Sequence, residues 1–141
     1  MAIDKDSVSL PFRSGMIRTL IISNDFTFLA TLARLLITRF PSIIIEAAKN
    51  REEALRKIRS FKPSIVFIDI SLTEECCFDL AMQIKSLFLG VIIIILIDYD
   101  IPEYYEAARQ SGADYFFAKQ SVNVNEILDL METIIGSRKE T

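Results

Sequence analysis

The sequence predicts an α/β domain in which a parallel sheet carries helices on both faces, and three observations support this fold class. Five short apolar segments recur along the 141 residues. Each segment is almost continuously apolar rather than alternating, which is typical of strands buried on both faces. Stretches with a helical period lie between them, and parallel strands need such crossover connections. Five strand-helix units in succession therefore predict a doubly wound five-stranded parallel sheet flanked by five helices.

The strands are delimited by their apolar runs and the first helix by its flanking residues. The predicted strands are TLII (19–22), IIIEA (43–47), IVFI (65–68), VIIIILI (91–97) and YFFA (115–118). The stretch FTFLATLARLLITRF follows the first strand, with Asn24 and Asp25 as candidate N-caps, and it stops at Pro41. Asn and Asp accept hydrogen bonds from the first free amides of a helix, and Pro cannot continue one. We therefore expect the first helix between these residues.

The second and third helices have similar signals. Asn50 followed by Glu53 forms a capping box, which predicts a second helix running to about Ser60. The third helix is expected to begin near Thr73, because two glutamates follow it in the first turn, where acidic side chains favour the helix dipole. Gly90 marks the limit before which this helix ends.

The last two helices are bounded by the usual asymmetry of helix ends. Pro102 lies in the first turn of the fourth helix, and Gly112 closes it. The fifth helix starts at Asn123 with Glu126 as the second residue of its capping box. Its apolar residues form one stripe, and Gly136 is expected to end it.

The length and composition indicate one globular domain. A chain of 141 residues suits a single core, and 51% of its residues are hydrophobic while 25% are charged. We expect the domain to span residues 16–136. Residues 1–15 fit no strand-helix unit and are predicted to be a mobile N-terminal arm. Residues 137–141 are expected to be a tail or the start of a linker.

Composition argues against several functional classes. The net charge is −3 and no long Lys/Arg block occurs, so we expect no nucleic-acid binding by this domain. The longest apolar run, residues 91–97, is far shorter than the roughly 20 residues of a membrane span, so no membrane insertion is expected. No secretory signal is recognisable, which favours a cytoplasmic location. The chain has no histidine, and Cys76 and Cys77 are its only cysteines, so a zinc site of the usual Cys/His type and an imidazole base are excluded.

Candidate chemistry lies where the strands end. Ligands of open parallel sheets bind beyond the carboxyl ends of the strands. The polar residues directly after the apolar runs are Ser23, Asn24, Asp25, Asp69, Asp98 and Lys119. Asp69 ends an apolar run, and a buried carboxylate is costly unless it is paired. Lys119 is the expected partner if the third strand is central. The alternative is that Asp69 only stabilises a loop and Lys119 is a solvated surface residue.

Three segments refine this pattern: NREEALRKI on the second helix, IVFID at the end of the third strand, and SGADYFFAK from the fourth helix into the fifth strand. With the five strand-helix units, they resemble the receiver domains of two-component response regulators over roughly residues 16–136. The resemblance implies a flavodoxin-like (CheY-like) sheet of strand order 2-1-3-4-5. It also implies a signalling module, with at most self-phosphotransfer and autodephosphorylation as activity. Asp69 would accept a phosphoryl group from a histidine kinase, and Lys119 would contact the phosphoryl oxygens.

The chain departs from this family at the magnesium site. Family members have an acidic pair after the first strand, and the matching positions here are Ser23 and Asn24. Magnesium prefers hard oxygen ligands, usually including carboxylates. The remaining candidate ligands are Asp69, Asn24 through its amide oxygen, and Asp25 if it turns inward. We therefore expect Mg²⁺ binding to be weak or lost.

A second departure concerns the switch residues. Ile97 stands where the family has a Thr or Ser that hydrogen-bonds the phosphoryl group. The next residue, Asp98, would repel a phosphoryl dianion. Phe116 matches the switch aromatic of the fifth strand, but without the hydroxyl at position 97 it is better interpreted as a core residue.

The resemblance also implies a contact surface made by the fourth helix, fifth strand and fifth helix, which relatives often use to form homodimers. Here it would include Tyr104, Tyr105, Ala108 and Phe116, and aromatic residues are common interface anchors. The alternative is that one of the tyrosines packs inward on the sheet. Adjacent helix positions diverge by a quarter-turn or more, so at most one of the two tyrosines is expected to be deeply buried.

These observations favour an atypical receiver domain that acts through protein contacts, with impaired or absent phosphorylation. A receiver that is phosphorylated on Asp69 by a histidine kinase is the first alternative. A flavodoxin-like domain that binds a flavin or nucleotide is the second. It would need a phosphate-binding loop, and SNDFTF offers Ser23 and Thr27 but no glycine.

Overall fold

The structure, a computed structural model, describes residues 17–69, 74–98, 101–119 and 123–140, and within them all side chains except those of 74–76 and 137–140. The predicted arm of residues 1–15 lies outside these ranges. Strands and helices alternate strictly. In chain order they are β1 (Ile17–Ile22), α1 (Phe26–Arg39), β2 (Ile43–Ala48), α2 (Arg51–Phe61), β3 (Ile65–Asp69), α3 (Glu74–Leu87), β4 (Ile92–Ile97), α4 (Pro102–Gln110), β5 (Tyr115–Ala118) and α5 (Val124–Glu140).

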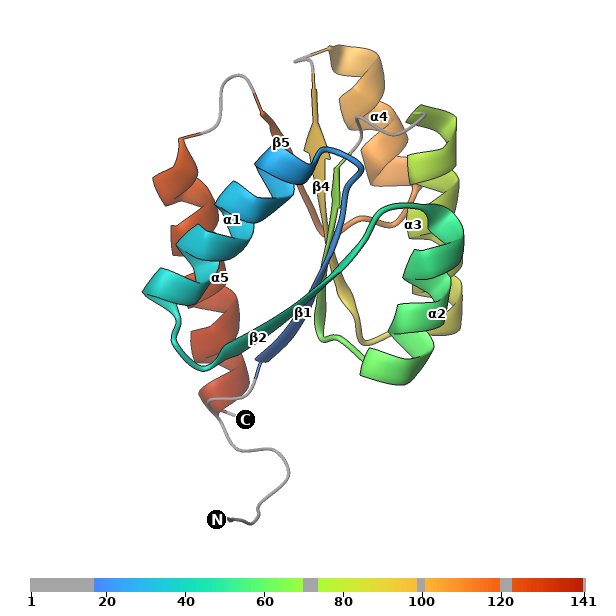
Figure 1. Ribbon diagram of the computed structural model, residues 1–141. Coiled ribbons are helices and arrows are strands. Elements are labelled where there is room, and N and C mark those ends of the chain that lie inside the picture. The colour runs from blue at the N-terminus through green and yellow to red at the C-terminus, as the bar shows by residue number, and fades with distance from the viewer. Residues whose placement is uncertain (1–16, 70–73, 99–100, 120–122, 141) are drawn as a thin grey trace.

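The strands form one parallel sheet of order β2-β1-β3-β4-β5. The predicted fold class and strand order are therefore confirmed. Helices α1 and α5 cover one face of the sheet, and α2, α3 and α4 cover the other (Figure 1). Strand β3 is central, and all five of its residues are buried. None of the helices in the described part of the chain has the length and apolarity needed to cross a bilayer.

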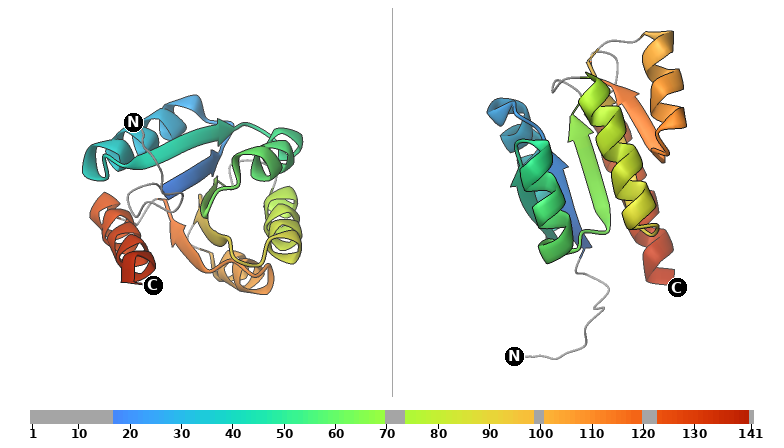
Figure 2. Two further views of the ribbon diagram at one scale, coloured as in Figure 1. Left: turned by 90° about the horizontal axis from the view of Figure 1, so that it is seen from below. Right: turned by 90° about the vertical axis from the view of Figure 1, so that its right-hand side faces the viewer.

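Two core layers follow from the alternation of side chains along the strands. Leu20 and Ile22 of β1 pack with α2, α3 and α4, whereas Ile21 packs with α1 and α5. The two layers lie on opposite sides of the sheet, and Figure 2 (right) shows α3 in front of it with α5 behind. Fully burying an Ile or Leu side chain contributes roughly 1.5–3 kcal/mol, so both layers stabilise the fold. The rigid sheet fixes where the strands end.

Most helix ends lie where the sequence predicts them. The side chain of Asp25 caps α1 by accepting a hydrogen bond from the amide of Phe28. Asn50 caps α2 in the same way by accepting from the amide of Glu53, and the Glu53 carboxylate accepts a hydrogen bond from the amide of Lys49, one residue before the predicted partner. Gly112 after α4 has a φ of 90°, a conformation that favours glycine.

The end of α5 differs from the prediction. The helix continues past Gly136 to Glu140, so the predicted end at this glycine is wrong. Glycine in a helix interior is less favourable than alanine by about 1 kcal/mol, which does not by itself stop a helix. A Cβ atom added at Gly136 would meet nothing within 4 Å. No close contact therefore requires a glycine at this position.

Candidate functional site

Asp69 and Lys119 meet at the carboxyl end of the sheet, as the sequence predicts. Asp69 is the last residue of the central strand β3 and has no exposed surface. Lys119 directly follows β5, two strands away, and its backbone amide is fixed by a 2.7 Å hydrogen bond to the carbonyl of Ile97. Its long side chain reaches back across the end of β4, so that its ammonium lies 2.8 Å from Oδ1 of Asp69. The predicted pairing is thus confirmed as a contact.

Ser23 is the second partner of Asp69. It follows β1, the neighbour of β3 on the other side, and is only 2% exposed. Its hydroxyl donates a 2.7 Å hydrogen bond to Oδ2 of Asp69 and accepts one of 3.0 Å from the amide of Asp25. Both carboxylate oxygens of Asp69 therefore have partners. This hydrogen bond from Ser23 to Asp69 was not predicted from the sequence, although the position of Ser23 directly after a strand is the signal that could have identified it as a donor.

Asp98 is the second carboxylate that contacts Lys119. Its Oδ1 lies 3.0 Å from the lysine ammonium, with 33% of the Asp98 side chain and 18% of the Lys119 side chain exposed. From the sequence, Asp98 was expected only to repel a phosphoryl group, and this ion pair was not predicted. We call Ser23, Asp69, Asp98 and Lys119 the Asp69 cluster.

Two opposing effects set the pKa of Lys119. Burial disfavours the charged form and would lower the pKa, but hydrogen bonds to and charges on Asp69 and Asp98 outweigh burial and raise the pKa above its ordinary value. The ammonium also lies 4.3 Å from the centre of the Phe28 ring, within the range of a cation–π contact. Lys119 is therefore a firmly held cation at neutral pH.

The candidate magnesium ligands Asp69, Asp25 and Asn24 have different surroundings in the structure. Asp25 caps α1, since its Oδ1 accepts a 3.1 Å hydrogen bond from the amide of Phe28, and the inward turn that the sequence left open is not the arrangement in the structure. Asn24 is exposed at the start of the same loop. Among the described residues, no group of three or more His, Cys, Asp or Glu could hold a metal ion. The carboxylates of Asp69 and Asp98 already share one ammonium, and the neutral side chains of Ser23 and Asn24 add no further anionic ligand of the kind that Mg²⁺ prefers.

The two switch positions are core residues. Ile97 is fully buried in the layer under α2, α3 and α4. Phe116 is partly buried and packs against the same layer, and its ring centre lies 4.9 Å from that of Tyr105. The packing agrees with the core interpretation of Phe116.

The predicted contact surface is only partly available. Ala108 is fully buried and belongs to the core, so its inclusion in an exposed interface is wrong. Tyr104 and Tyr105 are both partly buried against that core, and Tyr104 also lies near Phe78, with ring centres 6.5 Å apart. Neither tyrosine is deeply buried, which agrees with the prediction that at most one of the two would be. Both residues on α4 remain partly exposed.

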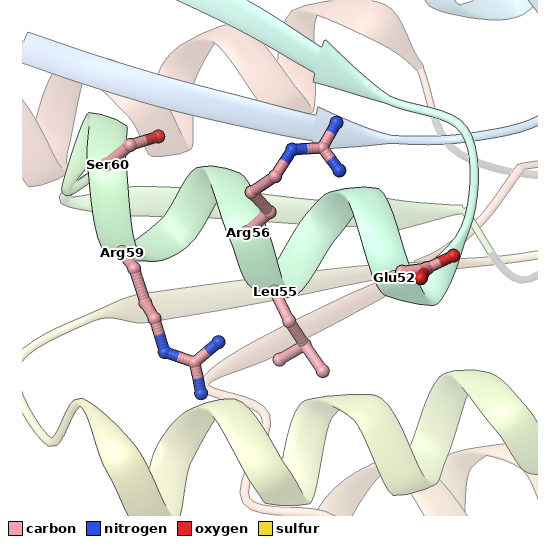
Figure 3. A pocket seen from close by; sticks show the side chains of 5 residues that line it. All are labelled: Glu52, Leu55, Arg56, Arg59 and Ser60. Atoms are coloured by element: carbon pink, nitrogen blue, oxygen red, sulfur yellow. The ribbon is translucent and has the colours of Figure 1, made fainter.

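Two hollows lie outside the hydrogen-bonded part of the cluster. One of about 220 Å³ borders Lys119 between α1 and α5, and its lining is Phe28, Thr31, Leu32, Leu35, Leu96, Lys119, Val124 and Ile127. The other, of about 670 Å³, lies over α2 and is lined by Glu52, Leu55, Arg56, Arg59 and Ser60. In Figure 3, Leu55 and Arg59 project from one side of α2 and Arg56 from the other. This second hollow involves no residue of the Asp69 cluster.

Comparison with known proteins gives a consistent family assignment. The sequence model of the response regulator receiver domain family matches residues 19–132. The uncharacterized transcriptional regulatory protein YvfU of Bacillus subtilis is 29% identical over 119 residues, which are 84% of this chain and 58% of that protein. Sensory transduction protein LytT of the same species is 31% identical over 85 residues, 60% of this chain and 35% of that protein. The chain thus spans about half the length, or less, of these curated relatives.

Solved structures show the same architecture. A two-component response regulator from Clostridium difficile is 27% identical with a TM-score of 0.75, covering 89% of this chain and 99% of that one. A response regulator from Burkholderia pseudomallei, solved with a phosphorylated aspartic acid, a calcium ion and citrate, is 27% identical with a TM-score of 0.72, covering 88% and 71%. A CheY-like receiver domain protein from Methanospirillum hungatei shares the fold at 23% identity, with a TM-score of 0.76 and coverage of 89% and 98%.

Proposed function

This chain belongs to the response regulator receiver domain family of two-component signalling, and we propose that it acts through protein contacts while magnesium-dependent phosphorylation of Asp69 is impaired or absent. Receiver domains are signalling modules rather than enzymes in the ordinary sense, and response regulators interact with histidine kinases and other signalling proteins. The single observation that carries the proposal is the ion pair between Asp69 and Lys119, in a site where the described residues include no group of three or more His, Cys, Asp or Glu that could hold a metal ion.

The first support is the charge at the acceptor. Phosphoryl transfer depends on positioning and on neutralising the charge of the transferred group. In this site the ammonium of Lys119 is shared by Asp69 and Asp98, so its positive charge is already neutralised before any phosphoryl group arrives. Ser23 offers a neutral hydroxyl where the family has a carboxylate. A bound Mg²⁺ would therefore have fewer anionic oxygen ligands here than in the family.

The second support is the state of the acceptor itself. Asp69 has no exposed surface, and one oxygen accepts from Lys119 while the other accepts from Ser23. Because hydrogen bonds to a carboxylate are charge-assisted, these two contacts stabilise the unphosphorylated form of Asp69. Ile97 offers no hydroxyl to stabilise the product. Each of these features raises the barrier to transfer or lowers the stability of the phosphorylated form.

A phosphorylation-competent receiver is the second candidate function. The contact between Asp69 and Lys119 favours it, because the family uses these two residues as acceptor and phosphoryl contact. The related Burkholderia pseudomallei protein was solved with a phosphorylated aspartic acid. The family match favours both receiver functions over a flavin- or nucleotide-binding domain.

A titration with beryllofluoride, which mimics a phosphoryl group, separates the two receiver functions. Calorimetry and the intrinsic fluorescence of the four tyrosines would be followed while Mg²⁺ and beryllofluoride are added. The proposal expects no saturable binding at millimolar Mg²⁺. Saturable binding that disappears in the Asp69→Asn variant would instead establish the competent receiver.

A further inference from the structure

Asp98 occupies a place that makes its charge part of the acceptor site. It directly follows β4, which lies between β3 and β5, and the side chain of Lys119 crosses the end of β4 to reach Asp69. On this route the lysine ammonium comes within 3.0 Å of Asp98 and 2.8 Å of Asp69. One cation thus bridges two carboxylates that belong to adjacent strands.

The bridge is held by the sheet rather than by two mobile surface side chains. The amide of Lys119 is bonded to the carbonyl of Ile97, the residue before Asp98, at 2.7 Å. Phe28 lies 4.3 Å from the ammonium and adds an aromatic contact. With 18% of its side chain exposed, Lys119 is shielded from much of the solvent screening that weakens surface ion pairs.

The charges of this bridge oppose the binding of a further anion. Two carboxylates and one ammonium leave the site with one net negative charge when these groups are ionised. A phosphoryl group carries about 1.5 to 2 negative charges at neutral pH. On Asp69 it would need Lys119 as its counter-ion, and it would meet Asp98 already bound there. Both the competition and the repulsion act against the phosphoryl group.

We propose that Asp98 is a built-in anion that takes the place of a phosphoryl oxygen on Lys119, so that the unmodified domain already has the ion pairing that phosphorylation would otherwise create. Asp98 is thus a positioning residue that holds Lys119 in one arrangement and excludes a phosphoryl group from the site. This inference rests on the proposed function and adds a physical cause for it. Phosphorylation of Asp69 is impeded by the carboxylate of Asp98 as well as by the loss of metal ligands.

The first test asks whether Asp98 and Lys119 are energetically coupled. The unfolding equilibrium constant would be measured in urea for the wild type, Asp98→Asn, Lys119→Met and the double variant. Asp98→Asn should change the unfolding equilibrium constant of the wild type by some factor. In the Lys119→Met background we expect this factor to be smaller by about threefold or more, as for contacting residues in a double-mutant cycle. Additive effects would overturn the proposal, because the bridge would then contribute nothing in solution.

The second test distinguishes an anion that closes the site from an ion pair that only stabilises the fold. Beryllofluoride with Mg²⁺ would be titrated into the wild type and Asp98→Asn, and into the same pair carrying Asn24→Asp to strengthen metal binding. We expect Asp98→Asn to tighten beryllofluoride binding by about tenfold or more. Glu103→Gln on the exposed face of α4 makes the same charge change without contacting Lys119, and it should alter affinity less than about twofold.

The proposed role of Asp98 would be overturned if the wild type and Asp98→Asn bound beryllofluoride with equal affinity both with and without Asn24→Asp. The same holds if neither protein bound it. Tight binding by the wild type would instead overturn the proposed impairment of phosphorylation. The two failures are distinguishable, because the first is a ratio between variants and the second is the affinity of the wild type itself.

Discussion

The hydroxyl of Ser23 donates a 2.7 Å hydrogen bond to Oδ2 of the buried Asp69. A neutral donor thus stands at the position where receiver domains have an acidic residue. The hydrogen bond compensates part of the burial of Asp69, which a second carboxylate at this distance would not do without a metal ion. Ser23 therefore stabilises the buried carboxylate of Asp69 through a hydrogen bond.

Replacing Ser23 tests this supporting role. We expect Ser23→Ala to lower the free energy of unfolding by about 1.5–3 kcal/mol, because a buried charged acceptor loses a hydrogen bond. Urea unfolding followed by circular dichroism measures the change. Ser60→Ala, on the exposed surface of α2, is the control and should change stability by less than about 0.5 kcal/mol. Equal effects of the two substitutions would contradict the account.

Removing the cation should be more harmful than removing the hydroxyl. Lys119→Met leaves the buried Asp69 without its counter-ion, and breaking a buried pair in this way costs about 3–5 kcal/mol of stability. The double variant Asp69→Asn/Lys119→Met should recover part of the loss, because no buried charge remains. The exposed pair of Arg39 and Glu132 provides the control, since Arg39→Gln should cost less than about 1 kcal/mol. A loss from Lys119→Met as small as this control would show that the pair is not formed in solution.

The raised pKa of Lys119 predicts a pH dependence at the alkaline end. Because the pKa is higher in the folded than in the unfolded chain, the ion pair stabilises the fold fully below the ordinary lysine pKa of about 10.4. The stabilisation is lost as the pH rises through the folded pKa. The unfolding free energy of the wild type should therefore fall towards that of Lys119→Met in this range. Parallel pH profiles of the two proteins would contradict the prediction.

The exposed parts of Tyr104 and Tyr105 on α4 are predicted to contribute to a homodimer contact. We expect Tyr104→Ala and Tyr105→Ala to shift the protein towards monomer in size-exclusion chromatography with light scattering. Phe26 on α1 is 81% exposed on the opposite face of the sheet, so Phe26→Ala serves as the control and should leave the distribution unchanged. A wild type that stays monomeric at every concentration would refute this contact.

The fold and the central pair could be predicted because both follow from strand ends. Continuous apolar runs identified parallel strands, and a parallel sheet brings the residues after its strands to one edge. Asp69 and Lys119 lie at such positions, so their meeting required only the strand order.

Details that depend on loop backbone and helix phase could not be predicted in the same way. The side chain of Asp25 could either cap α1 or turn towards Asp69. It caps α1, because it accepts a hydrogen bond from the otherwise free amide of Phe28. Ala108 lies one helical turn after Tyr104 and so shares its inward-facing side, where the smaller residue is buried completely. The pair of Asp98 with Lys119 depends on how the chain leaves β4, which the sequence pattern does not specify.

A crystal structure of the protein grown in millimolar Mg²⁺ tests the central claim most directly. The account predicts that the ammonium of Lys119 stays on Oδ1 of Asp69 and that no metal ion binds the carboxylate. An octahedral ion at about 2.1 Å from Asp69, with Asp25 or Asn24 turned inward as a further ligand, would contradict it.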